Sequence, residues 1–276
     1  MRTKLFVPGS RPDLFGKAMA GEADALSIDL QDAVEESRKA EARVATGNFL
    51  KSLPHEKTKV MIVRVNAITS RHFEADVEAI RCPGLDMVNV PRVESAEDVC
   101  RATAVTKDIP ILANIETAKG LRLAAEIAAA HPKVAGLQLG FGDLLEPLGI
   151  DRGNPAIVLH CQLLMRLAAG EAGIFAYDSA YADVNDLEGL KREAEGARKL
   201  GYLGKSAIHP RQVPVINATF RPSAEEIAYS IKVVETARDA KARGVGAWTV
   251  DGKMVDAPFV MRAENTLALA TRLGLL

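Results

Sequence analysis

The sequence has few cysteines and no long apolar run, and each absence excludes a class of protein. Its three cysteines, Cys82, Cys100 and Cys161, are scattered and lack CxxC spacing, so we expect neither a disulfide framework nor a zinc site. No apolar stretch approaches the roughly 20 residues that span a bilayer. The N-terminal segment reaches proline and charge too early to be the apolar part of a signal peptide. These features favour a cytoplasmic protein.

Net charge is also nearly absent. The 276 residues carry a formal charge of −1, which provides no basic field for binding nucleic acid or an anionic membrane. Any anionic ligand must therefore be held by a local cluster of arginine or lysine. With 48% hydrophobic and 26% charged residues, the composition is that of an ordinary globular protein of one large or two small domains.

Short apolar segments alternate with amphipathic ones along most of the chain. The apolar segments are residues 4–7, 25–30, 60–65, 87–90, 111–115, 134–139, 174–177 and 205–208. Runs such as VMIVRV are apolar on both faces, as buried parallel strands are. Helical patterns lie between them at residues 13–20, 37–50, 72–80, 95–106, 118–130, 156–169 and 187–200.

This alternation predicts an α/β fold, a (β/α)8 TIM barrel over residues 1–222. A doubly wound sheet is the alternative, but it usually needs fewer strands, and no GxGxxG follows the first strand. Residues 223–276 form a C-terminal segment with a different pattern, namely a helix at 223–244, a hairpin around Asp251-Gly252 and a helix at 258–273. An isolated hairpin is marginally stable, so we expect it to lie on this barrel's mouth or on a neighbouring subunit.

Polar residues stand where the predicted strands end, which is where a (β/α)8 barrel carries its catalytic residues. They are Asp29, Gln31, Asp32, Arg64, Asn66, Arg92, Glu116, Asp143, Lys205 and His209. No GxSxG elbow accompanies them, so a hydrolase triad has no support. A lone histidine such as His209 is more often a structural hydrogen-bonding residue than a base.

Glu116 and Asp143 follow neighbouring predicted strands, the fifth and the sixth. Two converging carboxylates suit a hard cation such as Mg²⁺, which also retains waters and accepts substrate oxygens. They could equally cap the helices that follow them or pair with arginine. Arg64 ends an apolar strand, where a buried guanidinium needs a partner. It could form a salt bridge with Asp29 or Asp32, hold a substrate carboxylate or thioester oxygen, or do both.

Nine segments, in this order, carry a resemblance to a known family: LFVPGSRPDLFGKA, IDLQDAV, VRVN, VPRVESAEDV, NIETAKGL, GFGDL, YADVNDLEGL, GKSAIHPRQV and DGKMVDAP. Together they resemble the HpcH/HpaI aldolase and citrate lyase superfamily, in its CitE-like branch. The resemblance covers nearly the whole chain.

The resemblance implies a magnesium-dependent barrel that forms a homotrimer, in which the C-terminal segment acts as a lid over a neighbour's active site. Glu116 and Asp143 match the family's magnesium ligands, and Arg64 matches the arginine that contacts substrate and the thioester oxygen. Asp256 matches the acid/base contributed from the lid. The other residues expected to bind substrate are Asp29, Gln31, Asp32 and Gly142.

The activity implied by the resemblance is cleavage or formation of the carbon–carbon bond of a 3-hydroxy-acyl-CoA such as malyl-, methylmalyl-, citramalyl- or citryl-CoA. The expected partners are acyl-CoA and keto-acid molecules, with no nucleic acid and no membrane. Three alternatives remain: a citrate lyase β subunit acting on acyl-carrier-protein thioesters, an HpaI-like aldolase acting on free hydroxy-keto acids, and a non-catalytic relative. Two departures bear on substrate preference, because Gln31 replaces a family glutamate and Arg92 a frequent lysine.

Overall fold

The computed structural model describes residues 1–276, and its first part is a closed barrel of eight parallel strands. Each strand pairs with the next, and β8 closes on β1 through the Lys4–Ser206 pairing. The predicted (β/α)8 fold is confirmed. The strands are β1 Thr3–Pro8, β2 Ala25–Asp29, β3 Val60–Arg64, β4 Met87–Val90, β5 Ile111–Ile115, β6 Val134–Leu139, β7 Phe175–Asp178 and β8 Gly204–Ala207.

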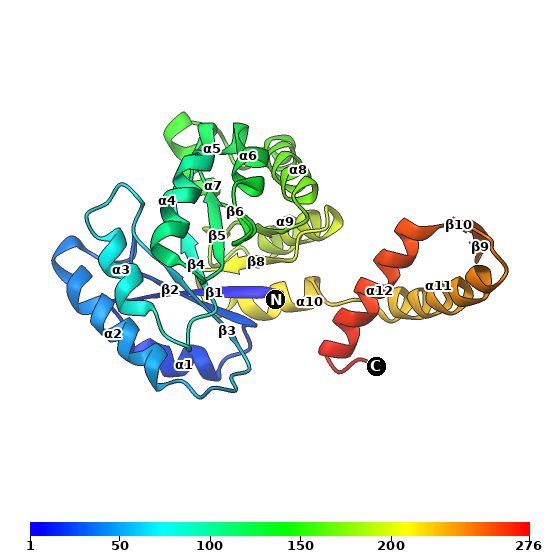
Figure 1. Cartoon of the computed structure of the whole chain (residues 1–276), viewed down its shortest axis with the longest axis horizontal. Coiled ribbons are helices and arrows are strands. Elements are labelled where there is room, and N and C mark those ends of the chain that lie inside the picture. The colour runs from blue at the N-terminus through cyan, green and yellow to red at the C-terminus, as the bar shows by residue number, and fades with distance from the viewer. The chain divides into compact units, whose positions relative to one another are not determined.

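Helices surround the strands (Figure 1). They are α1 Phe15–Ala20, α2 Lys39–Ser52, α3 Phe73–Ile80, α4 Ala96–Thr106, α5 Ala118–Arg122, α6 Ala124–Ala129, α7 Phe141–Leu145, α8 Pro155–Glu171, α9 Leu187–Lys199 and α10 Gln212–Thr219. Short 3₁₀ turns cover Pro12–Leu14, Glu36–Arg38 and Glu146–Leu148. None of the helices combines the length and the hydropathy that crossing a membrane requires.

Local sequence signals explain several helix starts. The Ser95 hydroxyl accepts a hydrogen bond from the Asp98 amide at 3.1 Å, and the Thr117 hydroxyl accepts one from the Gly120 amide at 3.0 Å. Each supplies an acceptor to an N–H that the helix leaves unpaired. The helix predicted at 118–130 is wrong as one element, because it divides at Leu123, whose φ of −102° and ψ of 14° interrupt the regular helix.

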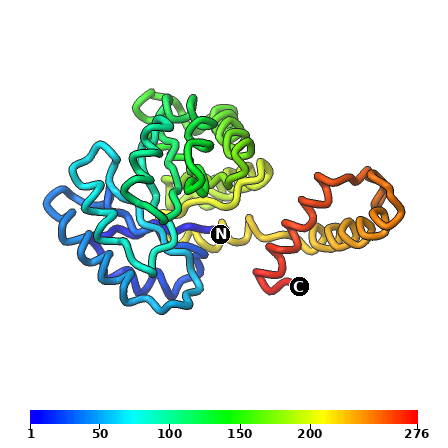
Figure 2. Tube along the Cα trace, in the orientation of Figure 1, coloured from blue at the N-terminus to red at the C-terminus, as the bar shows by residue number.

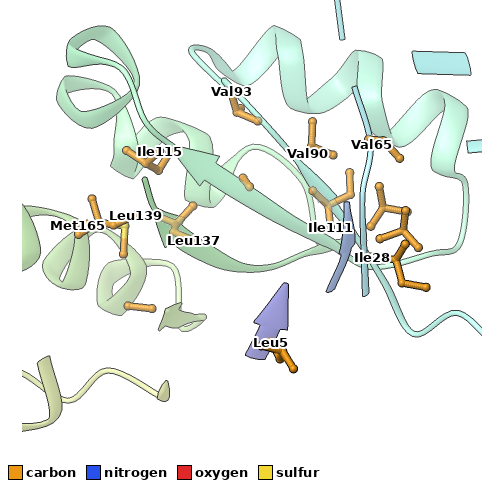
Figure 3. Packing of buried hydrophobic residues seen from close by; sticks show 14 of the residues in the cluster. Leu5, Ile28, Val65, Val90, Val93, Ile111, Ile115, Leu137, Leu139 and Met165 are labelled. Atoms are coloured by element: carbon orange, nitrogen blue, oxygen red, sulfur yellow. The ribbon is translucent and has the colours of Figure 1, made fainter. Parts of the chain in front are cut away.

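The main hydrophobic core fills the layer between barrel and helices. Side chains alternate along each strand, so one set points outward into this layer and the other into the barrel. Figure 3 shows part of this layer, where Leu137 and Leu139 of β6 lie beside Met165 of α8. A second cluster joins side chains from β2, β3, β5 and β7, which meet only inside the barrel; it contains Met1, Ala25, Ile62, Leu112 and Tyr177.

The remainder of the chain, Arg221–Leu276, forms a second compact unit, separate from Met1–Phe220. It contains α11 Ala224–Ala242, the strands β9 Trp248–Val250 and β10 Lys253–Val255, and α12 Ala257–Arg272. Asp251 and Gly252 both have positive φ, 48° and 76°, as the type I′ hairpin turn requires. The chain reverses direction through this hairpin, and α12 packs against α11 (Figure 2).

The core of this second unit is small. It consists of Val233, Val250, Val255 and Ala263, with Trp248 packed against it. The Trp248 indole donates a hydrogen bond to the Thr236 hydroxyl at 3.0 Å, which ties the hairpin to α11.

Candidate active site

A cavity of about 490 Å³ opens at the C-terminal ends of the barrel strands. Most of the residues that the sequence places in the site line it, namely Asp29, Asp32, Arg64, Glu116, Gly142 and Asp143. The strand ends bring them together because parallel strands end at the same rim of a barrel. Gln31 and Asp256 are not among the residues that line this cavity.

Arg64 is fixed by a two-pronged contact with Asp29. Its Nε donates to Asp29 Oδ1 at 2.8 Å, and its Nη2 donates to Oδ2 at 2.6 Å. The Asp29 carboxylate is 2% exposed and also accepts backbone N–H bonds from Gln31 and Ala33. Burial by itself raises the pKa of Asp29, but the Arg64 charge and these hydrogen bonds outweigh it and hold the pKa below its ordinary value. Asp29 therefore orients Arg64, and its own oxygens are already engaged.

The second carboxylate beside Arg64, that of Asp32, is more exposed to solvent. Its Oδ2 lies 3.4 Å from Arg64 Nη1, and its side chain is 58% exposed. Partial burial raises the pKa of Asp32, while the Arg64 charge opposes the shift. Asp32 thus offers an accessible oxygen beside a guanidinium that Asp29 already holds in place.

Glu116 stands at the end of β5 and is almost fully buried. Its Oε1 accepts the Arg92 backbone N–H at 2.8 Å, and its Oε2 accepts Asn114 Nδ2 at 3.0 Å. Burial raises the pKa of Glu116 above its ordinary value; the Arg64 charge opposes this and the Asp143 charge reinforces it. A Cβ added at Gly140 would lie 2.7 Å from Glu116 Oε2, so glycine at this position leaves room for the carboxylate.

Arg92 contacts both predicted metal ligands. The sequence did not reveal this bridging role. Its backbone N–H binds Glu116, while its Nη2 donates to Asp143 Oδ1 at 3.2 Å. It adopts a left-handed conformation with φ of 52°, which costs a non-glycine residue about 1 kcal/mol. Pro91, directly before it, ends the strand.

The carboxylate oxygens at this rim are of the kind that binds a magnesium ion. No three His, Cys, Asp or Glu side chains converge as a closed metal cluster. Mg²⁺ does not need one, since it is commonly held by one or two carboxylates together with waters and substrate oxygens. Glu116 and Asp143 both line the cavity, where they would supply two hard oxygen ligands, and the open space beside Gly142 leaves room for waters and substrate oxygens.

Arg152 is a second arginine of the cavity wall, and the sequence offered no signal for it because it lies in a loop. Its Nη2 donates to Glu193 Oε1 at 2.6 Å and to the Ala180 carbonyl at 2.7 Å. Its guanidinium carbon lies 4.9 Å from the centre of the Phe141 ring. These contacts hold the charge at the edge of the cavity.

Lys205 and His209 do not line the cavity, although the sequence predicted both to be among the polar residues at the strand ends. Lys205 is fully buried outside the barrel lumen, where Nζ lies 2.7 Å from Asp178 and 2.5 Å from Glu193. His209 Nδ1 accepts the Arg211 backbone N–H at 3.2 Å. Both therefore have structural partners.

Gln31 and Asp256 each carry an oxygen without a partner. Gln31 Oε1 and Asp256 Oδ1 are enclosed and make no hydrogen bond. Asp256 stands immediately before α12, where its carbonyl accepts the Phe259 and Val260 amides but its carboxylate caps nothing. It belongs to the C-terminal unit, so its role in catalysis stays a prediction.

Comparison with known proteins agrees with this architecture. Residues 2–210 match the family described as HpcH/HpaI aldolase/citrate lyase. The (3S)-malyl-CoA thioesterase of Cereibacter sphaeroides is 36% identical over 270 residues, covering 98% of this chain and 94% of that protein. The citrate lyase β subunit of Haemophilus influenzae is 33% identical over 283 residues, covering 98% and 96%.

A solved structure is similar over almost the same span. The CitE protein of Mycobacterium tuberculosis, in complex with magnesium, acetoacetate and coenzyme A, superimposes with a TM-score of 0.79 at 34% identity and covers 98% of both chains. The fold, the polar rim and these relatives agree, and the chain belongs to the HpcH/HpaI aldolase/citrate lyase family.

Proposed function

We propose that this chain cleaves or forms the carbon–carbon bond of a 3-hydroxy-acyl-CoA thioester. One observation carries the proposal: a single cavity combines two carboxylates suited to Mg²⁺, Glu116 and Asp143, with a guanidinium that Asp29 holds rigidly. The relatives support the substrate class, since one is named for malyl-CoA and another was solved with coenzyme A.

Arg64 would stabilise the negative charge that appears on the thioester oxygen when the bond breaks. A donor fixed in advance toward a developing oxyanion contributes about 3 kcal/mol to such a step. The bidentate salt bridge with Asp29 supplies this preorganisation, because Arg64 cannot move away without leaving a buried carboxylate unpaired. Glu116 and Asp143 would hold Mg²⁺, which when bound withdraws charge from the carbonyl and carboxylate of the keto acid.

Asp256 would move the proton at the enolate carbon, and we propose that it does so as part of a lid in a homotrimer. The C-terminal unit supports this role, because its core of four buried residues is too small to stabilise it alone. Its apolar side chains Met254, Phe259 and Met261 are 59%, 44% and 62% exposed. Burial of this surface against a neighbouring subunit would stabilise the unit and bring Asp256 to a cavity.

Thioester hydrolysis is the second candidate, favoured by the relatives named (3S)-malyl-CoA thioesterase. Hydrolysis breaks the carbon–sulfur bond and yields the hydroxy acid and free CoA. Carbon–carbon cleavage yields a keto acid and a shorter acyl-CoA. The products separate the two reactions without ambiguity.

The test is an assay of the purified protein with Mg²⁺ and malyl-, methylmalyl-, citramalyl- and citryl-CoA. Keto acid and free thiol are measured in parallel. We expect keto acid from at least one thioester, loss of activity with EDTA, and loss in Asp256→Ala. Asp251→Asn is the matched control, since Asp251 is an exposed hairpin carboxylate paired with Lys232, and asparagine tolerates its positive φ.

Free thiol without keto acid would replace the lyase proposal by the thioesterase. Keto acid released only from thioesters of an acyl-carrier protein would indicate the citrate lyase β subunit role. An Asp256→Ala variant as active as Asp251→Asn would refute the role of Asp256 as the lid acid.

A further inference from the structure

The centre of the barrel lumen is polar. Strand register directs six polar side chains inward, and all of them are buried: Lys4, Ser27, Asn89, Asn114, Gln138 and Ser206. Barrel interiors are usually filled by branched aliphatic residues. Three atoms of this group, Ser27 Oγ, Asn89 Oδ1 and Ser206 Oγ, have no hydrogen-bond partner. Because apolar residues would fill this space at lower cost, the polar group needs another explanation.

Among these six side chains, Lys4 has the largest free-energy cost of burial. It is 0% exposed and forms no ion pair. Its Nζ lies 4.3 Å from the centre of the Phe6 ring and donates a hydrogen bond to Gln138 Oε1. Burial lowers the pKa of Lys4 well below its ordinary value. A methionine or leucine at this position would avoid the desolvation penalty of the amine.

Gln138 connects Lys4 to the cavity. Its side chain is 3% exposed and lines the cavity floor. Lys4 Nζ donates this hydrogen bond, and a donor requires an acceptor. The Gln138 carboxamide therefore points Oε1 toward Lys4 and Nε2 away from it. Nε2 makes no hydrogen bond within the protein and is not enclosed. Its two N–H donors are therefore available to a ligand in the cavity.

Gln138 also lies beside the proposed metal ligands. It pairs in register with Asn114, whose side chain donates to Glu116. A CoA thioester must leave the cavity through its mouth, so the floor receives the short acid half of the substrate. That half is the part released as a keto acid.

We infer that Gln138 is a specificity-determining donor to an oxygen on the substituent of the keto acid, and that Lys4 is its positioning residue. The preferred substrate class is one whose keto acid carries a second carboxylate, as oxaloacetate does, over one with hydrogen or methyl there. A methyl group would leave the Gln138 N–H groups desolvated and unpaired, which a site built on hydrogen bonding discriminates against. The inference rests on the proposed function, because it assumes that a keto acid occupies this cavity.

The test is calorimetric binding of oxaloacetate and pyruvate in the presence of MgCl₂, which requires no turnover. We expect the wild type to prefer oxaloacetate. Gln138→Met and Lys4→Met should each lower that preference by roughly 10- to 100-fold, the loss of one hydrogen bond to a charged group. The double variant should lose no more than Gln138→Met, since the two residues act as one unit.

Gln138→Glu is the sharpest variant. It keeps the shape of the side chain and an oxygen for Lys4, but it replaces the Nε2 donors by an acceptor. We expect it to lose the preference as fully as Gln138→Met. Lys59→Met is the matched control, because Lys59 binds the Gly21 and Ala23 carbonyls outside the cavity.

Melting temperatures separate positioning from a structural role. Lys4→Met should melt at or above the wild-type temperature while losing the preference, which a merely structural lysine would not do. The inference is overturned if the wild type binds neither acid, if it shows no preference for oxaloacetate, or if all Gln138 variants retain the preference within twofold. Failure of the lyase assay together with the expected binding shifts would remove the proposed reaction and leave this assignment standing.

Discussion

Asp29→Asn removes the carboxylate that holds Arg64, and its cost can be worked out from the contacts. Asp29 accepts four hydrogen bonds, two from Arg64 at 2.8 and 2.6 Å and two from backbone amides at 2.9 and 3.0 Å. Asparagine retains one oxygen, and its NH₂ group faces the Arg64 Nη2 and Ala33 N–H donors. Two buried donors lose their acceptor, and the Arg64 charge loses its main counter-ion. We expect a destabilisation of about 3–5 kcal/mol.

The same change should reduce turnover. Arg64 keeps one hydrogen bond, from Nε to the remaining oxygen, and the longer contact to Asp32, so its direction toward the substrate is no longer fixed by two bonds to one carboxylate. A misplaced donor of this kind lowers kcat by about 10²-fold. Urea unfolding measures the first effect, and the keto-acid assay under saturating thioester measures the second.

Asp32→Asn is the matched control. It alters a carboxylate that is 58% exposed and 3.4 Å from Arg64, so it should change the unfolding free energy by less than about 1 kcal/mol. If the unfolding free energies of Asp29→Asn and Asp32→Asn differ by less than about 1 kcal/mol, the role given to the Arg64–Asp29 salt bridge is refuted.

The pH dependence of stability offers a second check on Asp29. Its folded-state pKa lies below the ordinary value of 3.8, so its stabilisation is present above that pH. The stabilisation is lost as pH falls through the folded-state pKa. Urea unfolding between pH 5 and pH 2 should therefore show a shallower loss of stability in Asp29→Asn than in the wild type. An unchanged acid slope would contradict the ion pair.

Substitutions at three further positions test the rim of the cavity. The pKa of Glu116 is raised, so its stabilising contribution is present below the ordinary value of 4.5 and is lost as pH rises through the folded-state pKa. Glu116→Gln should therefore remove this loss of stability with rising pH, so its melting temperature in EDTA should fall less between pH 4 and pH 7 than that of the wild type; it should also abolish the stabilisation by Mg²⁺. An equal fall in both proteins would contradict this. Gly140→Ala should weaken Mg²⁺ binding about tenfold or more by calorimetry, because the added Cβ would meet Glu116 Oε2 at 2.7 Å. Arg92→Gly should relieve backbone strain of about 1 kcal/mol, whereas Arg92→Val should be the less stable of the two in urea, and the reverse order would refute the strain.

The identity of the site residues could be predicted because strand ends in a barrel share one rim. Glu116 follows the apolar run ILANI and Asp143 follows VAGLQL, and both line the cavity. The hairpin could be predicted in the same way, because Asp251-Gly252 tolerates positive φ where most residues do not.

Whether a side chain points into the barrel or outward could not be predicted from its place in the sequence alone. The sequence groups Glu116 and Lys205 as polar residues of the strand ends, yet Glu116 points into the cavity, whereas Lys205 lies within β8 and points outward to Asp178. Inward and outward positions differ by a single residue of register, and register depends on how all eight strands close. The left-handed conformation of Arg92 likewise accompanies a contact that only the folded barrel makes, the hydrogen bond from its backbone N–H to Glu116.

The sequence by itself determined the eight strands, their alternation with helices and the polar rim, because these depend on local periodicity and on where apolar runs stop. Only the tertiary structure decided which hydrogen-bond donors and acceptors pair with each other. Lys4 and Gln138 are separated by most of the barrel in sequence, and they pair because closure of the sheet brings β1 and β6 to the same lumen. Arg152 reaches the wall because Glu193 on α9 and the Phe141 ring hold it there.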